Sequence, residues 1–389
     1  MFPWACPLTL FASVSSSGKK RAGEGNGKPL QYLCQENPKW GHKELGMTEQ
    51  PPPQQTWLTD PFLSAGPMGI ENRTGVMQFH FRPFSTDPSV QVVLFVAFLL
   101  LYLGSLMGNF TIALTVWSER SLHTPMYFFL FVLAVLEIGY STDIAPLTLA
   151  SVVSMGKTTV SLPSCGAQMF FFIFFGGSDC VLLAVMAYDR YVAICHPLHY
   201  NLIMSWQSCT QMALGSLVLG FLLSLPLTAL ICRLPFCDNA EIYHFFCDMS
   251  AVMRLACADT RVHEAALYII SVAAVAIPFL LISISYAFIL ATVLRMKSAE
   301  GQRRAISTCS SHLIVVLLQY GSCTLIYLRP SSSYSPEEGR VVSLVYTFFS
   351  PLLNPLIYSM RNKEVKDAVG RLLRRQTPAQ KAKAFFSEK

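Results

Sequence analysis

The sequence predicts an all-α membrane protein, a seven-transmembrane helix bundle with a short amphipathic cytoplasmic helix after the seventh span. Hydrophobic residues make up 52% of the chain and charged residues only 13%, whereas about a quarter of an average soluble domain is charged. Seven segments have the apolar composition of a membrane span, which takes roughly 20 residues. Basic residues gather in some connecting loops and not in others, as is typical of loops on opposite sides of a membrane.

The seven predicted spans lie between residues 90 and 360. They cover 90–117, 126–151, 162–195, 207–232, 262–294, 304–328 and 341–360. The first is the clearest, and the last two are the least hydrophobic. Pro278 is expected to bend the fifth helix, and Ser-Pro-Leu-Leu-Asn-Pro interrupts the seventh, because proline removes a backbone donor from a helix. The long connection 233–261 is predicted to be an extracellular loop.

The positions of lysine and arginine orient these spans. The loop after the fifth span carries four basic residues against Glu300, and the stretch 361–375 carries six. The loop 233–261, in contrast, balances its arginines with acidic residues. Because basic loops stay in the cytoplasm, the tail 361–389 is predicted to be cytoplasmic and the N-terminus extracellular. Apolar residues at Val365, Val369 and Leu372 predict that the tail begins with an amphipathic helix suited to the inner leaflet.

The N-terminal 89 residues differ from the rest of the chain. Residues 1–67 are rich in Ser, Gly, Pro and Gln and contain too little apolar material for a core, so they are expected to be disordered. Residues 68–89 form the predicted extracellular segment before the first span. They include the sequon Asn72-Arg73-Thr74, which predicts an N-linked glycan on Asn72.

Four of the twelve cysteines lie at the predicted outer end of the third span or in the extracellular loop after the fourth. Cys165 stands at the outer start of the third span, and Cys237, Cys247 and Cys257 lie in the loop after the fourth. This compartment is oxidising, so two disulfides are expected. Four cysteines allow three pairings, and their spacing chooses none of them. The other cysteines show no Cys-x-x-Cys motif, which gives no support to a metal site.

Among the polar residues within the predicted spans, five acidic or amide side chains stand out, because a charge near the bilayer centre costs at least about 2.5 kcal/mol on insertion scales. Asn109, Glu137 and Asn354 fall near the middle of their spans and are predicted to share one polar cluster. For the asparagines, a functional role and simple helix association are equally good interpretations. Function is favoured for Glu137. Asp179 also lies in a span, and Asp143 lies far enough out to meet either water or a ligand.

The sequence contains no motif of the common enzyme classes. There is no Gly-x-Ser-x-Gly, His-Glu-x-x-His, P-loop or glycine-rich dinucleotide turn, so neither catalysis nor a cofactor is predicted. The net charge of +6 is modest, and no basic face points to nucleic acid as a partner. The acidic residues in the spans leave a transporter or channel as a second hypothesis, although the two halves of the chain show no inverted repeat.

Four motifs stand out in the spans and their connections, namely LHTPMYFFL at 122–130, MAYDRYVAICHPLHY at 186–200, RRAISTCSSHLIVV at 303–316 and PLLNPLIYSMRNKEVKDA at 351–368. They resemble the motifs of the odorant receptors among the rhodopsin-like G-protein-coupled receptors. The resemblance extends over residues 68–375. It implies a plasma-membrane receptor for smell that binds a small volatile odorant and activates a heterotrimeric G protein of the stimulatory olfactory type, which raises cyclic AMP. A related receptor for a non-volatile ligand outside the nose fits the same motifs.

The resemblance also assigns roles to individual residues. The proposed activation switch comprises Asp189, Arg190, Tyr191, Tyr286, Tyr320, Asn354, Pro355 and Tyr358. Asn109 and Glu137 match the polar core. Among the possible disulfides, the resemblance selects Cys165 with Cys247 and Cys237 with Cys257.

The ligand-binding positions implied by the resemblance come from the third, fifth, sixth and seventh spans. They are Phe172, Ile173, Gly176, Gly177, Ile270, Ser271, Ala274, Cys323, Thr324, Tyr327 and Thr347. This lining is mainly apolar with a few hydroxyls, which suits a small, weakly polar ligand. The two adjacent glycines are expected to leave room for a bulkier ligand beside the third span.

The chain departs from the usual pattern of this family at several positions. Gln319 stands where phenylalanine is common and is expected to add polarity beneath the pocket, and Asp179 replaces a usual glutamate. Sequences of the family typically begin shortly before a sequon, as the segment from Met68 does. Residues 1–67 are therefore either a genuine extension or an upstream in-frame addition.

Overall fold

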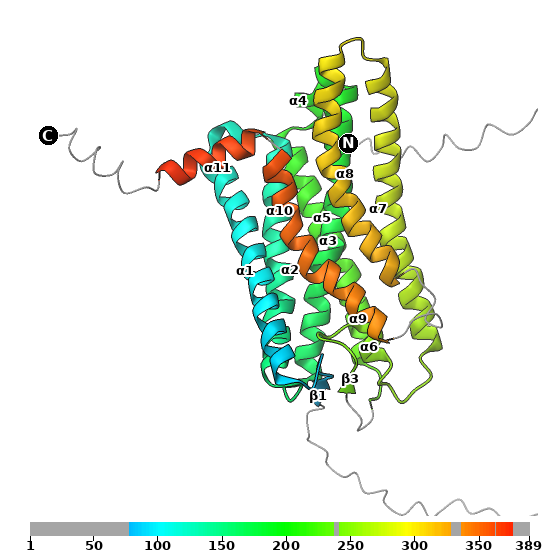
Figure 1. Cartoon of the computed structure of the whole chain (residues 1–389). Helices are drawn as coiled ribbons and strands as arrows, with labels where there is room; N and C mark the ends of the chain where they lie inside the picture. The colour runs from blue at the N-terminus through cyan, green and yellow to red at the C-terminus, as the bar shows by residue number, and fades with distance from the viewer. Residues whose placement is uncertain (1–77, 237–240, 328–335, 362, 376–389) are drawn as a thin grey trace, which may run out of the picture. The chain divides into compact units, whose positions relative to one another are not determined.

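The computed structural model describes residues 78–236, 241–327, 336–361 and 363–375. Within these residues, long helices run side by side in a bundle (Figure 1). The long helices are α1 (Pro88–Ser118), α2 (Pro125–Val153), α3 (Leu162–Cys195), α5 (Trp206–Cys232), α7 (Arg261–Arg295) and α8 (Ala299–Tyr327). The last long element consists of α9 (Pro336–Leu344), the π-helix η5 (Val345–Phe349) and α10 (Ser350–Arg361).

Shorter elements connect or flank these helices. They are η2 (Arg120–Leu122), η3 (Pro197–His199), α4 (Tyr200–Ile203), α6 (Met249–Met253), α11 (Lys363–Arg375) and the strands β1 (Gln78–Phe81), β2 (Thr159–Ser161) and β3 (Glu241–Ile242). The connection 233–261, predicted only as a loop, thus contains a short helix and a strand. Residues 1–67, the sequon at Asn72 and Cys237 lie outside the described residues.

Local sequence signals set where several of the long helices begin. The Asp87 side chain accepts a hydrogen bond from the Ser89 amide at 2.8 Å, and Pro88 occupies the first turn of α1. Ser161 and Ser205 cap α3 and α5 in a similar way. Such caps satisfy N–H groups that the first helical turn leaves unpaired. These helix starts are therefore encoded within a few residues.

Six helices in the described part of the chain are long and apolar enough to cross a membrane, namely α1, α2, α3, α5, α7 and the segment Gly339–Tyr358. Large apolar side chains on their outer faces stay exposed. Val93, Leu100 and Met107 of α1, for example, are 67%, 65% and 70% exposed. Such an extensive apolar surface is unfavourable in water, whereas lipid solvates it. The chain is a multi-pass membrane protein.

The predicted sixth span, 304–328, falls in α8, which is not one of these six helices. The beginning of α8 is polar, and Glu300 pairs there with Arg304. The helix packs against α3, α7 and α10, so it belongs to the same bundle. A crossing of the membrane by α8 stays a prediction from the sequence.

Helix α3 lies at the centre of the bundle and contacts α2, α5, α7 and α8. Its side chains Leu182, Leu183 and Ala187 are at most 1% exposed. The approach of α5 is close because Gly220 has no side chain, since a Cβ atom there would lie 2.2 Å from the Ser178 hydroxyl oxygen. Dense packing on all sides fixes α3, and with it the residues that face the centre of the bundle.

A proline interrupts the hydrogen bonds of the seventh element within α10. Pro355 has no N–H group to donate to the Pro351 carbonyl, one turn earlier. The Asn109 side chain of α1 donates to that carbonyl instead, at 2.9 Å. The two helices can approach because Gly108 lacks a side chain, since a Cβ atom there would lie 2.8 Å from the Pro355 ring. Gly108 therefore leaves room for the Pro355 ring, and the adjacent Asn109 satisfies the carbonyl that this proline leaves unpaired.

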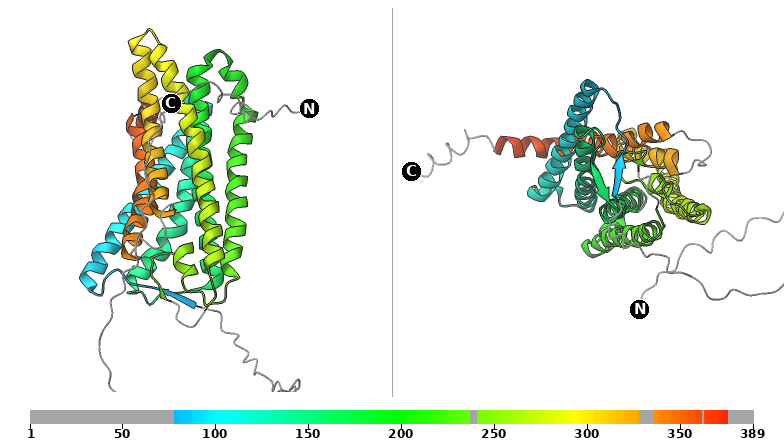
Figure 2. Two further views of the ribbon diagram at one scale, coloured as in Figure 1. Left: turned by 90° about the vertical axis from the view of Figure 1, so that its right-hand side faces the viewer. Right: turned by 90° about the horizontal axis from the view of Figure 1, so that it is seen from below.

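A small sheet covers the end of the bundle that the sequence predicts to be extracellular, called the outer end below. Its central strand β1 is antiparallel to β2, with Phe79 opposite Val160, and parallel to β3, with His80 opposite Glu241. The strand lies across the helix ends, as the blue arrow in the right-hand view of Figure 2 shows. Phe79 and Phe81 are fully buried. The sheet thus attaches the segment before α1 to two loops.

Helix α11 packs across the opposite end, called the inner end below. Val365 and Ala368 are fully buried in the main hydrophobic core. The Tyr127 hydroxyl of α2 donates to Glu364 at 2.7 Å. The apolar face that predicted this helix therefore packs against the bundle.

Candidate ligand pocket and switch site

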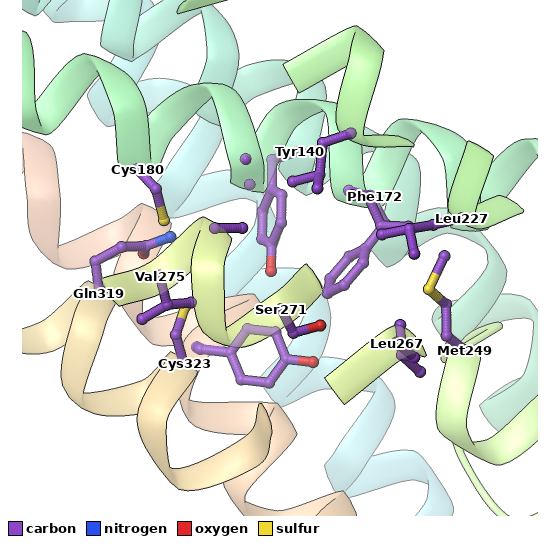
Figure 3. Close-up of a pocket in the computed structure, with 16 residues that line it drawn as sticks. Tyr140, Phe172, Cys180, Leu227, Met249, Leu267, Ser271, Val275, Gln319 and Cys323 are labelled. Carbon is purple, nitrogen blue, oxygen red and sulfur yellow. The ribbon is translucent and has the colours of Figure 1, made fainter. Parts of the chain in front are cut away.

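A pocket lies among α3, α5, α7 and α8 (Figure 3). It is open on one side, and its empty space with that open side included is about 690 Å³. Most of its lining is aliphatic or aromatic. The polar groups are the hydroxyls of Tyr140, Ser271 and Tyr346, the Gln319 carboxamide and two thiols.

Seven of the predicted ligand positions line this pocket, namely Phe172, Ile173, Gly176, Gly177, Ser271, Ala274 and Cys323. Three others do not. Ile270 packs against the hydrophobic cluster at the outer end, and the hydroxyls of Thr324 and Thr347 donate to the carbonyls of Tyr320 and Ser343 within their own helices. The Tyr327 side chain lies outside the described residues.

The remaining lining residues are Tyr140, Cys180, Leu223, Leu227, Met249, Leu267, Val275, Gln319 and Tyr346. Some of these carry a signal that the sequence offered. Cys180 lies one turn from Gly176, and Leu267 lies one turn from Ser271, so helical periodicity would have extended the predicted set to them. The residues from α2, α5 and α6 carry no such signal, because their position depends on how the helices pack.

Among the described residues, the pocket lining contains no Asp, Glu, Lys, Arg or His. Asp143, which the sequence placed near water or ligand, does not line it. Its backbone carbonyl instead accepts a hydrogen bond from the Gln168 amide at 2.8 Å. The carbonyl oxygen of the Gln168 side chain accepts a hydrogen bond from the Cys247 backbone N–H at 2.9 Å. Gln168 thus connects α2 and α3 to the loop above the pocket.

A disulfide joins Cys165 at the start of α3 to Cys247, the pairing that the resemblance implies. It holds the loop residue Phe246 against Phe172 of the pocket wall, with ring centroids 4.9 Å apart. Cys257 is also disulfide-bonded. Its predicted partner Cys237 lies outside the described residues, so that pairing stays a prediction.

His244 anchors the same loop to the seventh element. The ring lies 3.0 Å from the Ser343 hydroxyl through Nε2 and stacks on Phe245. Burial, and secondarily the nearby Arg340 guanidinium, lowers the pKa of His244 to about 3. Arg340 itself donates to the Arg82 carbonyl at 3.0 Å. The neutral histidine and this arginine therefore hold the loop and the β1 segment against α9.

The predicted polar core is formed in part. Asn354 of α10 donates a hydrogen bond to the Glu137 carboxylate of α2. Asn109 does not join them directly and binds the Pro351 and Ser105 carbonyls. Asp179 of α3 is 3% exposed and lies near enough to Glu137 to interact with it electrostatically. The cluster therefore links α2, α3 and α10 at mid-bundle.

The predicted switch triplet lies at the inner end of α3. Arg190 is 3.7 Å from Asp189, and its side chain is only 12% exposed. Asp189 also accepts a hydrogen bond from the Tyr200 hydroxyl at 2.8 Å. Tyr191 pairs instead with His196, at 3.0 Å. Asp189 thus connects the arginine to α4 in the neighbouring loop.

A histidine that the sequence reading did not select joins three helices near Arg190. His312 of α8 hydrogen-bonds the Tyr286 hydroxyl of α7 at 2.9 Å and the Leu183 carbonyl of α3 at 3.1 Å. Its position in the motif Ser-Thr-Cys-Ser-Ser-His was the available signal. Tyr358 of α10 is buried in the adjoining core.

Tyr320 lies apart from this inner cluster, next to the pocket. Its hydroxyl donates to the Cys180 carbonyl at 2.8 Å, which ties α8 to α3. Cys180 lines the pocket, and Tyr320 follows Gln319, which also lines it. Helix α8 is therefore fastened to α3 at two levels, by Tyr320 near the pocket and by His312 toward the inner end.

Comparison with known proteins gives a consistent set of matches. A family model described as olfactory receptor matches residues 98–376. Human olfactory receptor 10V1 is 67% identical over 304 residues, which cover 78% of this chain and 98% of the relative. Human olfactory receptor 10Q1 is 56% identical over 301 residues, 77% of this chain and 94% of that protein. These matches confirm the resemblance read from the motifs, and the chain belongs to the olfactory receptor family.

Proposed function

We propose that this chain is an odorant receptor that binds a small volatile molecule in the pocket among α3, α5, α7 and α8 and then activates a heterotrimeric G protein. The observation that carries the proposal is a mainly apolar pocket, lined by seven of the positions that the family resemblance implies, in a chain whose relatives are olfactory receptors. The family consists of receptors rather than enzymes. Coupling to the stimulatory olfactory G protein, with a rise in cyclic AMP, follows from the resemblance of the switch motifs.

Helix α8 offers the physical link between the two ends of the bundle. It carries Gln319 and Cys323 in the pocket lining and His312 toward the inner end. A ligand between α3 and α8 alters the spacing of helices that also surround Arg190. Activation is then a population shift, because the ligand favours the arrangement that it binds more tightly.

Arg190 is the residue proposed to act at the G protein side. Asp189 lies beside it and accepts a hydrogen bond from Tyr200. The ion pair with this fixed carboxylate restrains the Arg190 side chain. Separation from Asp189 frees the guanidinium for a new partner. The basic residues before α8 and in α11 support a cytoplasmic inner end, and hence an N-terminus outside the plasma membrane.

The test is a panel of volatile compounds applied to cells that display the receptor and report cyclic AMP. We expect at least one compound to raise cyclic AMP, and Arg190→Ala to abolish the response at equal surface expression. Arg233→Ala removes an exposed arginine at the outer end and serves as the matched control that keeps the response. An equal response of the Arg190→Ala variant, or a ligand-gated current in cells without G proteins, would contradict the proposal.

A further inference from the structure

We propose that the pocket selects an uncharged ligand with one hydrogen-bonding head group, such as a small alcohol or ketone. The head binds at Gln319, and the apolar body passes Gly176 toward Leu227 and Met249. This inference rests on the proposed function and narrows it to a ligand class and a binding orientation. It is carried by the charge, the polarity and the empty space of the lining.

The part of the lining that the structure describes holds no Asp, Glu, Lys, Arg or His, which favours an uncharged ligand. A carboxylate or ammonium group entering this pocket loses its water and finds no opposite charge. Burying an unpaired ion in this way is far more costly than burying a neutral polar group. Asp143 and Asp179 do not line the pocket and offer a cation no contact there.

The strongest hydrogen-bonding group at one end of the pocket is the Gln319 carboxamide. Figure 3 shows Gln319, Cys180 and Cys323 together at this end. The Cys180 thiol interacts with both the Gln319 amide and the Cys323 thiol. Because a carboxamide has two N–H donors and one carbonyl acceptor, while a thiol bonds only weakly, Gln319 keeps capacity for a ligand oxygen. This end therefore suits an alcohol or a carbonyl group.

The opposite end is lined by aliphatic side chains. Leu227, Leu267 and Met249 lie there, away from Gln319, as Figure 3 shows. Apolar ligand surface buried against them is removed from water, which favours binding. The two ends differ in polarity, so a ligand with one polar and one apolar end has a preferred direction in the pocket.

The two adjacent glycines have different roles between these ends. A Cβ atom at Gly176 would meet only the Tyr140 ring, at an ordinary 3.7 Å, whereas one at Gly177 would lie 3.2 Å from Leu223. Gly177 therefore lets α5 approach α3, and Gly176 leaves space in the pocket. Gly176 sets the width available to the body of the ligand.

The first experiment compares ligands that share one carbon skeleton and differ only in the head group. A primary alcohol, a methyl ketone, an alkane, a carboxylic acid and an amine are tested by cyclic AMP at neutral pH. We expect the alcohol or ketone to act at roughly tenfold lower concentration than the alkane and at about a hundredfold lower concentration than the ionised compounds. A preference for the acid or the amine would overturn the inference and leave the proposed function standing.

Two pairs of variants test the assigned residues. Gln319→Leu is expected to reduce the tenfold difference between alcohol and alkane to within about threefold, while Gln211→Leu, at an exposed glutamine of α5, retains it. Gly176→Val is expected to abolish responses to branched skeletons and keep those to slim ones. Gly215→Val is its control, because a Cβ there meets nothing within 4 Å. An unchanged head-group preference in Gln319→Leu would contradict the orientation.

A readout without signalling separates the inference from the proposed function. Methyl methanethiosulfonate transfers its methylthio group to a thiol, forming a sulfur–sulfur bond and releasing methanesulfinic acid. Labelling of Cys180 and Cys323 is followed by peptide mass spectrometry, with Cys180→Ser and Cys323→Ser to assign the peptides. We expect the neutral polar compounds to slow labelling at these two sites and the ionised compounds to leave it unchanged. Such protection without any cyclic AMP response would support the inference and contradict the signalling function. The absence of both protection and response would overturn the inference and the signalling function together.

Discussion

Asn109 replaces a hydrogen bond that the backbone of α10 cannot make. Its side chain donates to the Pro351 carbonyl at 2.9 Å, where the missing N–H of Pro355 leaves an acceptor unpaired. Asn109→Leu removes this donor and leaves a buried carbonyl unsatisfied. We expect it to lower the free energy of unfolding by about 1 to 3 kcal/mol, measured as a lower Tm of the purified receptor.

Asn201→Leu is the matched control, because Asn201 is exposed in α4. Its Tm is expected to stay within a degree or two of the wild type, since surface substitutions usually change stability by less than about 0.5 kcal/mol. Equal Tm values for the two variants would show that the Asn109 hydrogen bond contributes little.

His244 makes stability depend on pH in a defined direction. Its pKa in the folded receptor is about 3, against roughly 6.5 for an unfolded chain. Between pH 6.5 and pH 3, His244 is therefore protonated in the unfolded chain and neutral in the folded receptor. The contribution of His244 to the free energy of unfolding is complete above pH 6.5 and is lost as the pH falls toward 3. At pH 5 we expect a loss of about 2 kcal/mol, measured as the change in Tm between pH 7 and pH 5.

The controls for His244 isolate this proton from the others. His244→Asn is expected to show a smaller change in Tm between pH 7 and pH 5, whereas His80→Gln, at an exposed histidine of β1, keeps the wild-type change. A change in Tm of the same size in His244→Asn would assign the pH dependence to other groups.

At the scale of elements, the close pairing of α1 with α10 depends in part on the missing side chain of Gly108. A Cβ atom at Gly108 would lie 2.8 Å from the Pro355 ring. Gly108→Leu forces the two helices apart, and we expect a loss of roughly 1 to 3 kcal/mol in stability, seen as reduced Tm and surface expression. Gly215→Leu places the same side chain where nothing lies within 4 Å and is expected to express normally. Comparable expression of both variants would contradict the close approach.

The helices and the small sheet differ in how far the sequence reveals them. α3 is bounded by a serine cap and a proline-containing loop and filled with apolar residues, signals that act within one segment. β1 and β3 span only four and two residues, too few for a recognisable alternation. Their pairing also joins segments more than 150 residues apart. Local patterns therefore predict the helices, whereas the sheet depends on tertiary contacts.

At the scale of the whole molecule, the same distinction applies to the pocket. The motifs of the third, fifth and sixth spans located residues such as Phe172, Ser271 and Cys323. Leu223, Met249 and Tyr140 were not found, because they come from elements whose rotation and depth are set by packing. Thr324 and Thr347 were selected for hydroxyls that bond within their own helices. Family motifs thus locate the site, and the arrangement of the helices decides its lining.

In the proposed mechanism, a ligand in the pocket controls Arg190 at the other end of the same bundle. The most direct measurement is nucleotide exchange by a purified stimulatory G protein, with the receptor in lipid nanodiscs and an odorant identified on cells. We expect the odorant to accelerate exchange with the wild type and with Arg233→Ala, and not with Arg190→Ala. An exchange rate that is the same with and without the odorant, or an acceleration that persists in Arg190→Ala, would contradict this mechanism.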